Sequence, residues 1–497
     1  MDFQSTLLNF KNTDDRIKFA LTLPEKLVLE ICSKNTELTN SICLNENYWK
    51  LRYLKNNKQP TTIPKSWKEL YFNNKNYEAY SCGFNMYGEL GLGDSGEGTD
   101  RNKPTRILNI EPKSVHCGGT HSIIVDTNRN AWSFGRNSSG QLGLGIEDYI
   151  STLPKQIQMP SGIKVKQVSV GDFFSMIIDT DSNVWSFGYN DKGQLGLGNV
   201  TNRNIPTQIQ NVKAKQIACG HDHAMIIDLN DNVWSFGNNE FGQLGLRYYY
   251  EENDYISTPT QIQNVKAKQI ACGGEHSIII DLNDNVWSFG HNNHGQLGLG
   301  LGELYISTST KIPNIKATQI ACGGEHSMIL DLNNNVWSFG RNIFGQLGLG
   351  NNETRNTPTQ IQNIKAGQIA CGYDQSMILD LNDNVWSFGY NAKGGLGLGD
   401  NQNRNIPTQI PNITAKQISC GFNYSMILSY RSLVISFDKI TSLFSSNEVT
   451  KFEFESHMQV YYRASNGIYM ATFTLKDGTK KYGYVRYNSS TNQILKP

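Results

Sequence analysis

The chain of 497 residues is long enough for two or three domains, or for one large repeat architecture with appendages. Its formal net charge of +1 and its 18% of charged residues exclude a strong overall bias toward nucleic acid, acidic partners or a membrane surface. Because no apolar run approaches the roughly 18 to 20 residues that cross a bilayer, and the first residues do not resemble a signal peptide, we expect a soluble, intracellular protein without a membrane partner.

Residues 1–79 predict a small helical domain, because apolar side chains recur there at helical spacing. The segment Leu23-Pro24-Glu25 with the later Leu27 and Ile31, followed by a Tyr-Trp pair that includes Trp49, resembles an F-box. This resemblance implies that the segment docks onto the adaptor subunit of a cullin-type ubiquitin ligase. Its candidate adaptor-binding residues are Leu23, Pro24, Leu27, Ile31 and Trp49. A helical cap over the rest of the protein is the alternative.

A basic stretch closes this first region. Between residues 48 and 76, seven Lys or Arg face one Glu, a local balance of +6. Such a patch could contact phosphates, but a solvated helix face explains it equally well. We therefore consider nucleic acid an unlikely partner.

A repeated unit of about 50 residues begins near residue 80. The aromatic residue of its VWSFGxN motif recurs at Tyr80, Trp132, Trp185, Trp234, Trp287, Trp337, Trp386 and, degenerately, Ile435. A second motif, IACGGxHSMIxD, recurs around Cys117, Val170, Cys219, Cys272, Cys322, Cys371 and Cys420. These copies predict seven units, and the cysteines are interpreted as buried structural thiols.

Each unit predicts antiparallel strands that are joined by tight turns. The Asn/Asp-rich segment 331–335 separates two β-rich runs, and the glycines of GQLGLG suit consecutive turns. One such unit cannot cover both faces of its own sheet, so stacking is required. We predict an all-β fold, a seven-bladed β-propeller over residues 80–437 that is closed by strand complementation. An open solenoid of the same repeats is the alternative.

The motif WSFGxNxxGQLGLG, followed by CGGxHSMIL, resembles the regulator of chromosome condensation repeat family. The resemblance implies a seven-bladed propeller. Because the founding member of that family is a guanine-nucleotide exchange factor for the small GTPase Ran, it also implies exchange on a Ran-like GTPase as an activity to be tested. The F-box resemblance points instead to a ubiquitin ligase.

Several patterns could carry chemistry, and each has a structural alternative that we favour. A ring of imidazoles at His121, His223, His276 and His326 could bind a metal, but Phe174 stands at an equivalent position and cannot be a ligand. The segment 281–285 begins like a calcium loop and then departs from it. No nucleophile elbow or paired-carboxylate motif is present. We therefore expect no catalytic residues, no metal and no cofactor.

The residues that break the repeat are the best candidates for binding. One insertion replaces the last Gly of its GQLGLG motif and combines aromatic and charged side chains, a composition that is favoured at interfaces. The candidate partner-binding residues are Arg247, Tyr248, Tyr249, Tyr250, Glu251, Glu252 and Asp254. A drifting surface loop is the alternative interpretation.

Residues 438–497 contain the runs QVYYRA, IYMATFTL and KKYGYVRY, which are separated by Asn-Gly and Asp-Gly turns. They predict a three-stranded β-meander. Together the regions predict a non-enzymatic interaction scaffold, with a protein partner on the propeller rim and a ubiquitin-ligase adaptor at the N-terminus. Guanine-nucleotide exchange on a Ran-like small GTPase is the alternative, and chromatin binding is a weaker one.

Overall fold

The computed structural model describes Ile17, Ala20, residues 77–145, 148–247 and 254–430, and four strands between residues 449 and 495. Ile17 and Ala20 are helical and buried; the remainder of the predicted helical domain, 1–79, lies outside the described residues. The chain divides into two compact units, Met1–Tyr430 and Arg431–Pro497, and each is described by itself.

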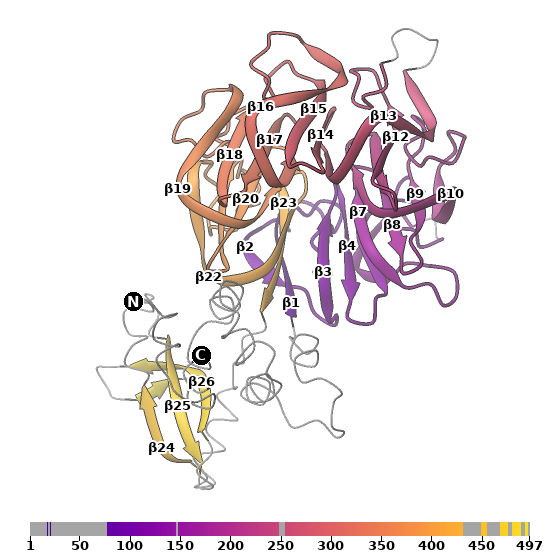
Figure 1. Cartoon of the computed structure of the whole chain (residues 1–497). Coiled ribbons are helices and arrows are strands. Elements are labelled where there is room, and N and C mark those ends of the chain that lie inside the picture. Colours follow the sequence, from indigo (N-terminus) through magenta and orange to yellow (C-terminus); the bar gives the residue numbers. More distant parts are fainter. Residues whose placement is uncertain are drawn as a thin grey trace. The chain divides into compact units, whose positions relative to one another are not determined.

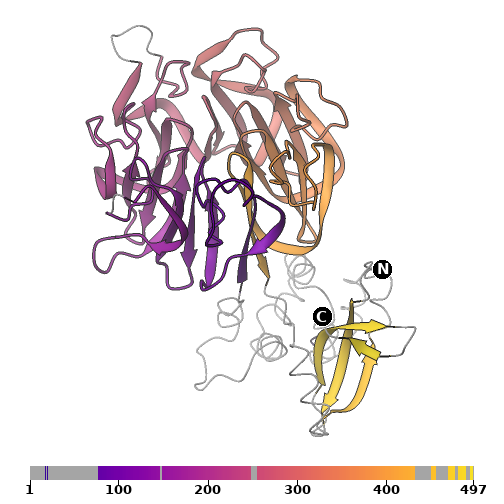
Figure 2. The ribbon, with the colours of Figure 1, turned by 180° about the vertical axis from the view of Figure 1, so that it is seen from behind.

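The first unit consists of four-stranded antiparallel sheets that follow one another around a common centre (Figure 1), as the view from behind also shows (Figure 2). The first two contain β3 (Pro112–Cys117), β4 (His121–Asp126), β5 (Ala131–Arg136) and β6 (Ile150–Gln156), then β7 (Val165–Val170), β8 (Phe174–Asp179), β9 (Asn183–Gly188) and the first half of β10 (Arg203–Cys219). The next two contain the rest of β10, β11 (His223–Asp228), β12 (Asn232–Asn238) and the first half of β13 (Tyr255–Cys272), then the rest of β13, β14 (His276–Asp281), β15 (Asn285–His291) and the first half of β16 (Tyr305–Cys322).

The remaining sheets continue the series to Tyr430. They contain the rest of β16, β17 (His326–Asp331), β18 (Asn335–Gly340) and the first half of β19 (Arg355–Cys371), then the rest of β19, β20 (Gln375–Asp380), β21 (Asn384–Gly389) and the first half of β22 (Arg404–Cys420), and finally the rest of β22, β23 (Tyr424–Tyr430), β1 (Tyr77–Gly83) and β2 (Arg101–Arg106). The strand assignment confirms the predicted all-β character of the repeats.

The two ends of the repeat region meet within one sheet. β1 pairs with β23 along its whole length, from Tyr77 opposite Tyr430 to Gly83 opposite Tyr424. Tyr80 lies opposite Ile427, as Trp386 lies opposite Ile378 in the preceding sheet. The predicted equivalence of Tyr80 to the repeated Trp is therefore confirmed, and β1 supplies the strand that closes the series. Ile435 lies outside the described residues.

Five long strands connect neighbouring sheets, because each is outermost in one sheet and innermost in the next. In β10, Thr207 pairs with Ser186 of β9, whereas Ile217 pairs with Ile226 of β11. An asparagine with a φ of 61° stands between the two halves, at Asn211. Asn tolerates this left-handed conformation better than most residues, so it bends the strand from one sheet to the next. The corresponding residues of the other long strands are Asn264, Asn314, Asn363 and Asn412.

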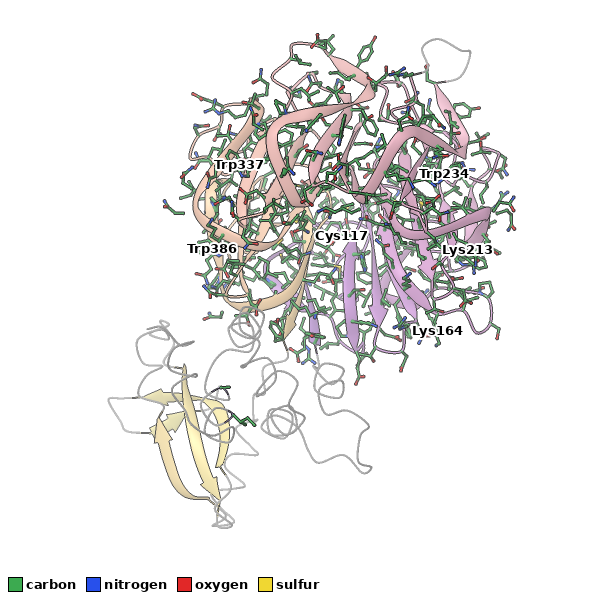
Figure 3. All side chains as sticks on the ribbon, viewed as in Figure 1. Cys117, Lys164, Lys213, Trp234, Trp337 and Trp386 are labelled. Carbon is green, nitrogen blue, oxygen red and sulfur yellow. The ribbon has the colours of Figure 1, made fainter. Side chains whose placement is uncertain are left out.

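The hydrophobic core lies between adjacent sheets. Ile278, Ile280 and Val286 from one sheet pack with Ile329 and Phe339 from the next. The Phe of each VWSFG segment is fully buried, whereas the Trp lies toward the outside, as Figure 3 shows for Trp234, Trp337 and Trp386. One unit thus completes its core only against its neighbour, as the repeat pattern predicts.

The hairpin predicted at 331–335 joins β17 to β18. One oxygen of the Asp331 carboxylate accepts hydrogen bonds from the amides of Asn333 and Asn335, at 2.8 and 2.9 Å. The other accepts from Asn335 Nδ2 at 2.7 Å and from Trp337 Nε1 at 3.0 Å. Burial alone would raise the pKa of Asp331, but these hydrogen bonds outweigh it and lower the pKa. The carboxylate therefore organises the turn and orients the Trp. The same arrangement recurs at 281–285, which is a hairpin turn.

The second unit contains one antiparallel sheet. Its strands are β24 (Val449–Phe454), β25 (Ile468–Leu475), β26 (Lys480–Asn488) and β27 (Gln493–Leu495), paired in that order. Two of the predicted runs form β25 and β26, but the prediction of three strands was wrong, because β24 and β27 flank them. The third predicted run, 459–464, lies outside the described residues.

Candidate functional site

One end of each sheet carries side chains that differ from unit to unit. In β14 and β15, His276 pairs with Gly290, so the residues just before His276 and just after Gly290 lie at the same end of the sheet. We call this end of the first unit the channel-mouth face. Its side chains at these repeat positions include Phe84, Arg136, Asp172, Phe173, Tyr189, His221, Asp222, Glu275, His291, Glu325, Arg341, Tyr373, Asp374, Tyr390 and Phe422.

These positions stand out against a nearly constant background. The segments QIQNVKAKQIACG at 208–220 and 261–273 are identical, yet His221-Asp222 follows the first and Gly274-Glu275 follows the second. The signal is thus present in the sequence as variation at fixed repeat positions. Motifs considered one at a time do not reveal it, because it emerges only when the units are aligned with one another.

A histidine on this face is held between two carboxylates. His221 Nε2 lies 3.0 Å from Asp172 Oδ2, and His221 Nδ1 lies 3.1 Å from Asp222 Oδ2. Hydrogen bonding to Asp172, and then to Asp222, raises the pKa of His221 to about 11 despite partial burial. The imidazole is therefore cationic at neutral pH and neutralises part of the acidic charge at this point.

Arg341 neutralises acidic charge in the same way, two sheets further along the chain. Its Nη1 lies 2.9 Å from Glu325 Oε2 and 3.6 Å from Asp374 Oδ1. Gln346 Nε2 also donates to Asp374 Oδ1 at 2.9 Å. Burial raises the pKa of Asp374, although Arg341 opposes the shift. Between these two clusters, burial raises the pKa of Glu275, and neighbouring Glu240 and Glu325 add to the increase.

Aromatic side chains surround the charged clusters. The Arg136 guanidinium lies 5.0 Å from the Tyr87 ring centroid and 5.3 Å from that of Phe173, within cation–π range of both. Tyr373 and Phe422 meet edge to face at 4.8 Å. Rigid aromatics beside charged groups are the side chains that contribute most at protein interfaces.

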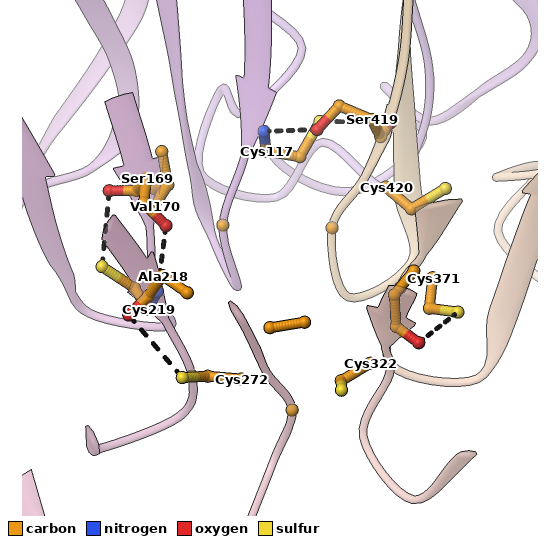
Figure 4. Close-up of a pocket in the computed structure, with 18 of the residues that line it drawn as sticks. Cys117, Ser169, Val170, Ala218, Cys219, Cys272, Cys322, Cys371, Ser419 and Cys420 are labelled. Carbon is orange, nitrogen blue, oxygen red and sulfur yellow. Dashed lines mark hydrogen bonds between the residues drawn. The ribbon is translucent and has the colours of Figure 1, made fainter. Parts of the chain in front are cut away.

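The channel-mouth face opens onto a cavity of about 410 Å³ at the centre of the series. Cysteines line it, as the labelled residues of Figure 4 show, and Figure 3 places Cys117 near the centre. All of their thiols except that of Cys322 lie near carbonyls of the preceding sheet, as Cys272 Sγ does 3.6 Å from the Ala218 oxygen. Burial raises the pKa of Cys219 to about 12, which keeps its thiol protonated. The cysteines lining the cavity are Cys117, Cys219, Cys272, Cys322, Cys371 and Cys420.

The histidines of the CGGxHS motif link one sheet to the next. His326 Nε2 lies 2.8 Å from Ser376 Oγ of the following sheet, and Ser376 Oγ donates to the Gln346 carbonyl at 2.8 Å. Because the serine hydroxyl donates elsewhere, Nε2 must be the donor to it. Equivalent contacts join His121 to Ser175, His223 to Ser277 and His276 to Ser327. Where the structure is described, no group of three or more His, Cys, Asp or Glu is placed to hold a metal.

Two of the seven residues predicted in the insertion are described. Arg247 and Asp254 are both exposed and flank the segment 248–253, so Tyr248, Tyr249, Tyr250, Glu251 and Glu252 lie outside the described residues. Arg247 lines a second cavity of about 740 Å³, away from the channel-mouth face. All five candidate adaptor-binding residues, Leu23, Pro24, Leu27, Ile31 and Trp49, also lie outside the described part.

Comparison with known proteins identifies the repeats. The family model of the RCC1-like domain matches residues 78–427, which is most of the chain. The chain belongs to the RCC1-like domain family. The match confirms the resemblance inferred from the WSFG and CGG motifs, and it does not extend to the segment that resembles an F-box.

The RCC1-like domain has relatives in proteins of several kinds. It is 39% identical over 233 residues to the human X-linked retinitis pigmentosa GTPase regulator, a match that covers 45% of this chain and 22% of the relative. It is 30% identical over 234 residues to human HERC6, a probable E3 ubiquitin-protein ligase, with the same two coverages. The matches thus span less than a quarter of either relative.

A solved structure also resembles the RCC1-like domain. Prp20p from Saccharomyces cerevisiae, which was crystallised in a study of its binding to Gsp1p and histones, superposes with a TM-score of 0.65 at 22% identity. The alignment covers 78% of this chain and 99% of Prp20p, and it shows a shared fold. Among the described residues, no helix has the length and apolar character to cross a membrane.

Proposed function

We propose that residues 77–430 form a seven-bladed propeller that acts as a non-enzymatic protein-interaction scaffold, and that the channel-mouth face binds the partner. The carrying observation is that units with nearly identical buried segments differ at this face, where charged and aromatic side chains gather. A purely structural role would be served by the same residues in every unit. Distinct side chains around the mouth instead provide a surface that one partner can recognise.

This proposal is tested by quantitative affinity purification with two variants of the full chain. The first changes Phe173, Tyr373 and Phe422 to Ala on the channel-mouth face. The second changes Leu229, Leu332 and Leu381 to Ala, which are exposed leucines at hairpin turns toward the other end of the sheets. We expect specific partners to be lost from the first variant and retained by the second, while both keep the wild-type melting temperature. Equal recovery on both variants would contradict the proposal.

We further propose that residues 1–79 connect this scaffold to a ubiquitin-ligase adaptor. The F-box resemblance and the similarity of the propeller to a probable E3 ubiquitin-protein ligase support this role. Purification of the full chain and of residues 80–497 tests it, because the adaptor should accompany only the full chain. Its absence from both preparations would remove the ligase half of the proposal and leave the scaffold intact.

The second candidate is guanine-nucleotide exchange on a Ran-like small GTPase. It is favoured by the 39% identity to a relative named as a GTPase regulator. Mixing the protein with Ran that carries fluorescent GDP should accelerate nucleotide release if this candidate holds. Release at only the spontaneous rate would exclude exchange. Binding of Ran to the wild type and its loss from the channel-mouth variant would then indicate binding at this face without exchange.

A further inference from the structure

Arg247 occupies a backbone position that is glycine in every other unit of the ring. Its φ is 62°, in the left-handed region that disfavours side chains. The equivalent residues, all with positive φ, are Gly93, Gly145, Gly198, Gly300, Gly350 and Gly399. A non-Gly residue here costs stability, and such strain persists where the surrounding structure holds it. The arginine is therefore an outlier that the fold tolerates.

The backbone at Arg247 keeps the inter-sheet hydrogen bond that the glycine units make, at a longer distance. The Arg247 amide donates to the Ser307 carbonyl at 3.3 Å, and Leu246 forms an isolated bridge with Thr308. At the equivalent positions the Gly300 amide donates to the Asn356 carbonyl at 2.9 Å and the Gly350 amide to that of Asn405 at 2.8 Å. The main difference from the glycine units is therefore the arginine side chain, and its surroundings indicate what it can bind.

That side chain lines the cavity of about 740 Å³ between two neighbouring sheets. Its guanidinium is exposed and has no hydrogen-bond or ion-pair partner among the described residues. The other charged side chains that line the groove have hydrogen-bond partners. Lys266 Nζ donates to the Asn230 carbonyl at 3.0 Å, and the Asp281 carboxylate accepts from Trp287 Nε1 at 3.0 Å. Within the described part of the chain, Arg247 is thus a cation without an ion-pair partner at one end of the groove.

One wall of the groove is formed by the outer half of β13 and the bend at Asn264, and residues Thr260–Lys266 all line it. On its inner edge this segment pairs with β12, with Gln261 opposite Trp234. Within the described strands, no other strand pairs with this half of β13. A free strand edge accepts an extended peptide through backbone hydrogen bonds. Leu282, which is 49% exposed, and Trp287 supply an apolar wall beside that edge.

We propose that this groove binds an extended segment of a partner protein that carries one acidic side chain. The segment adds to the edge of β13, its carboxylate pairs with Arg247, and an apolar side chain packs against Leu282 and Trp287. Charge complementarity selects the acidic residue, and the free edge selects the extended conformation. This second docking surface is distinct from the channel-mouth face and stands whether or not that face binds a partner.

The test is selection of a random nine-residue peptide library on the full chain, in parallel with the Arg247→Gly variant. We expect peptides with one Asp or Glu among apolar residues to be enriched on the wild type and not on the variant. A selected peptide made synthetically, and its analogue with the acid changed to Asn or Gln, then give affinities by fluorescence polarisation. Arg247→Gly and the change in the peptide should each weaken binding about fivefold, and together no more than either alone.

The variant is designed so that misfolding cannot imitate the result. Arg247→Gly restores the residue of the other units and removes backbone strain, so its melting temperature should equal or exceed that of the wild type. The channel-mouth variant should bind the selected peptide normally. Selection of no peptide, enrichment of neutral peptides, or equal affinity for Arg247→Gly would each overturn the proposal.

Discussion

At the scale of single residues, burial sets the protonation state of the repeated histidine. Burial lowers the pKa of His326 to about 3 and that of His276 to about 3, so both imidazoles are neutral in the folded chain at physiological pH. In the unfolded chain they ionise near pH 6.5. Because the unfolded state then binds protons that the folded state cannot, stability is lost as the pH falls from about 6.5 toward 3. Each buried histidine contributes roughly 2 kcal/mol to that loss at pH 5.

We expect His326→Gln to reduce this acid sensitivity. Gln375 stands at the equivalent position in the next unit, and its Nε2 donates to Ser425 Oγ at 3.0 Å, so glutamine can keep the inter-sheet bond without titrating. Urea unfolding of wild type and variant should converge or cross as the pH is lowered from 7 to 5. A constant difference in the free energy of unfolding across that range would contradict the assigned protonation state.

Gly323, three residues before His326, lies where close packing leaves no room for a side chain. A Cβ at Gly323 would lie 2.3 Å from His326 Cε1 and 2.6 Å from the Gly372 carbonyl oxygen. We expect Gly323→Ala to destabilise the protein by roughly 1 to 3 kcal/mol, because both neighbours are held within the core. Gly302→Ala is the matched control, since nothing lies within 4 Å of its added Cβ. Equal urea midpoints for the two variants would refute this account.

At the scale of elements, neighbouring sheets show a paired exception to the histidine–serine contact. Phe174 replaces the histidine of its unit, and Ala224 replaces the serine that such a histidine would contact in the next. Both residues are fully buried in one hydrophobic cluster. A hydroxyl facing a phenyl ring would lose a hydrogen-bond partner, so the two changes belong together.

A double-mutant cycle tests that coupling. Phe174→His and Ala224→Ser should each destabilise alone, whereas the double variant should recover about 0.5 to 1.5 kcal/mol relative to the sum. Chemical denaturation supplies the four free energies. Additive effects would mean that the sheets do not communicate through this pair.

The elements also show what the sequence could and could not predict. The hairpin at 331–335 was predictable because Asn and Asp favour such turns locally. The partner of His326 was not, because Ser376 lies in another unit and only the closed packing brings it near. Similarly, the channel-mouth face depends on how the ends of the strands align. The flanking strand β24, VTKFEF, was not among the predicted runs.

At the scale of the whole molecule, closure depends on a strand from the start of the repeat region. β1 contributes Ala79 and Cys82, both fully buried, to the sheet that it forms with β22, β23 and β2. We expect residues 77–430 to fold, and residues 84–430 to unfold at a markedly lower urea concentration or to aggregate through the exposed edge of β23. Size-exclusion chromatography and circular dichroism compare the two fragments. Equal stability would show that β1 is dispensable for the ring.

The five strands that pass from one sheet into the next also bear on how such a gene can change. Recombination between the DNA of identical segments, such as 208–220 and 261–273, deletes or adds one whole repeat. The junction then falls within a strand whose two halves still match their neighbours, so the product keeps the strand pairing on both sides of the junction and changes the circumference that β1 must close. Selection on such variants therefore acts on whether β1 can still pair with β23. The side chains of each unit can meanwhile diverge at the channel-mouth face.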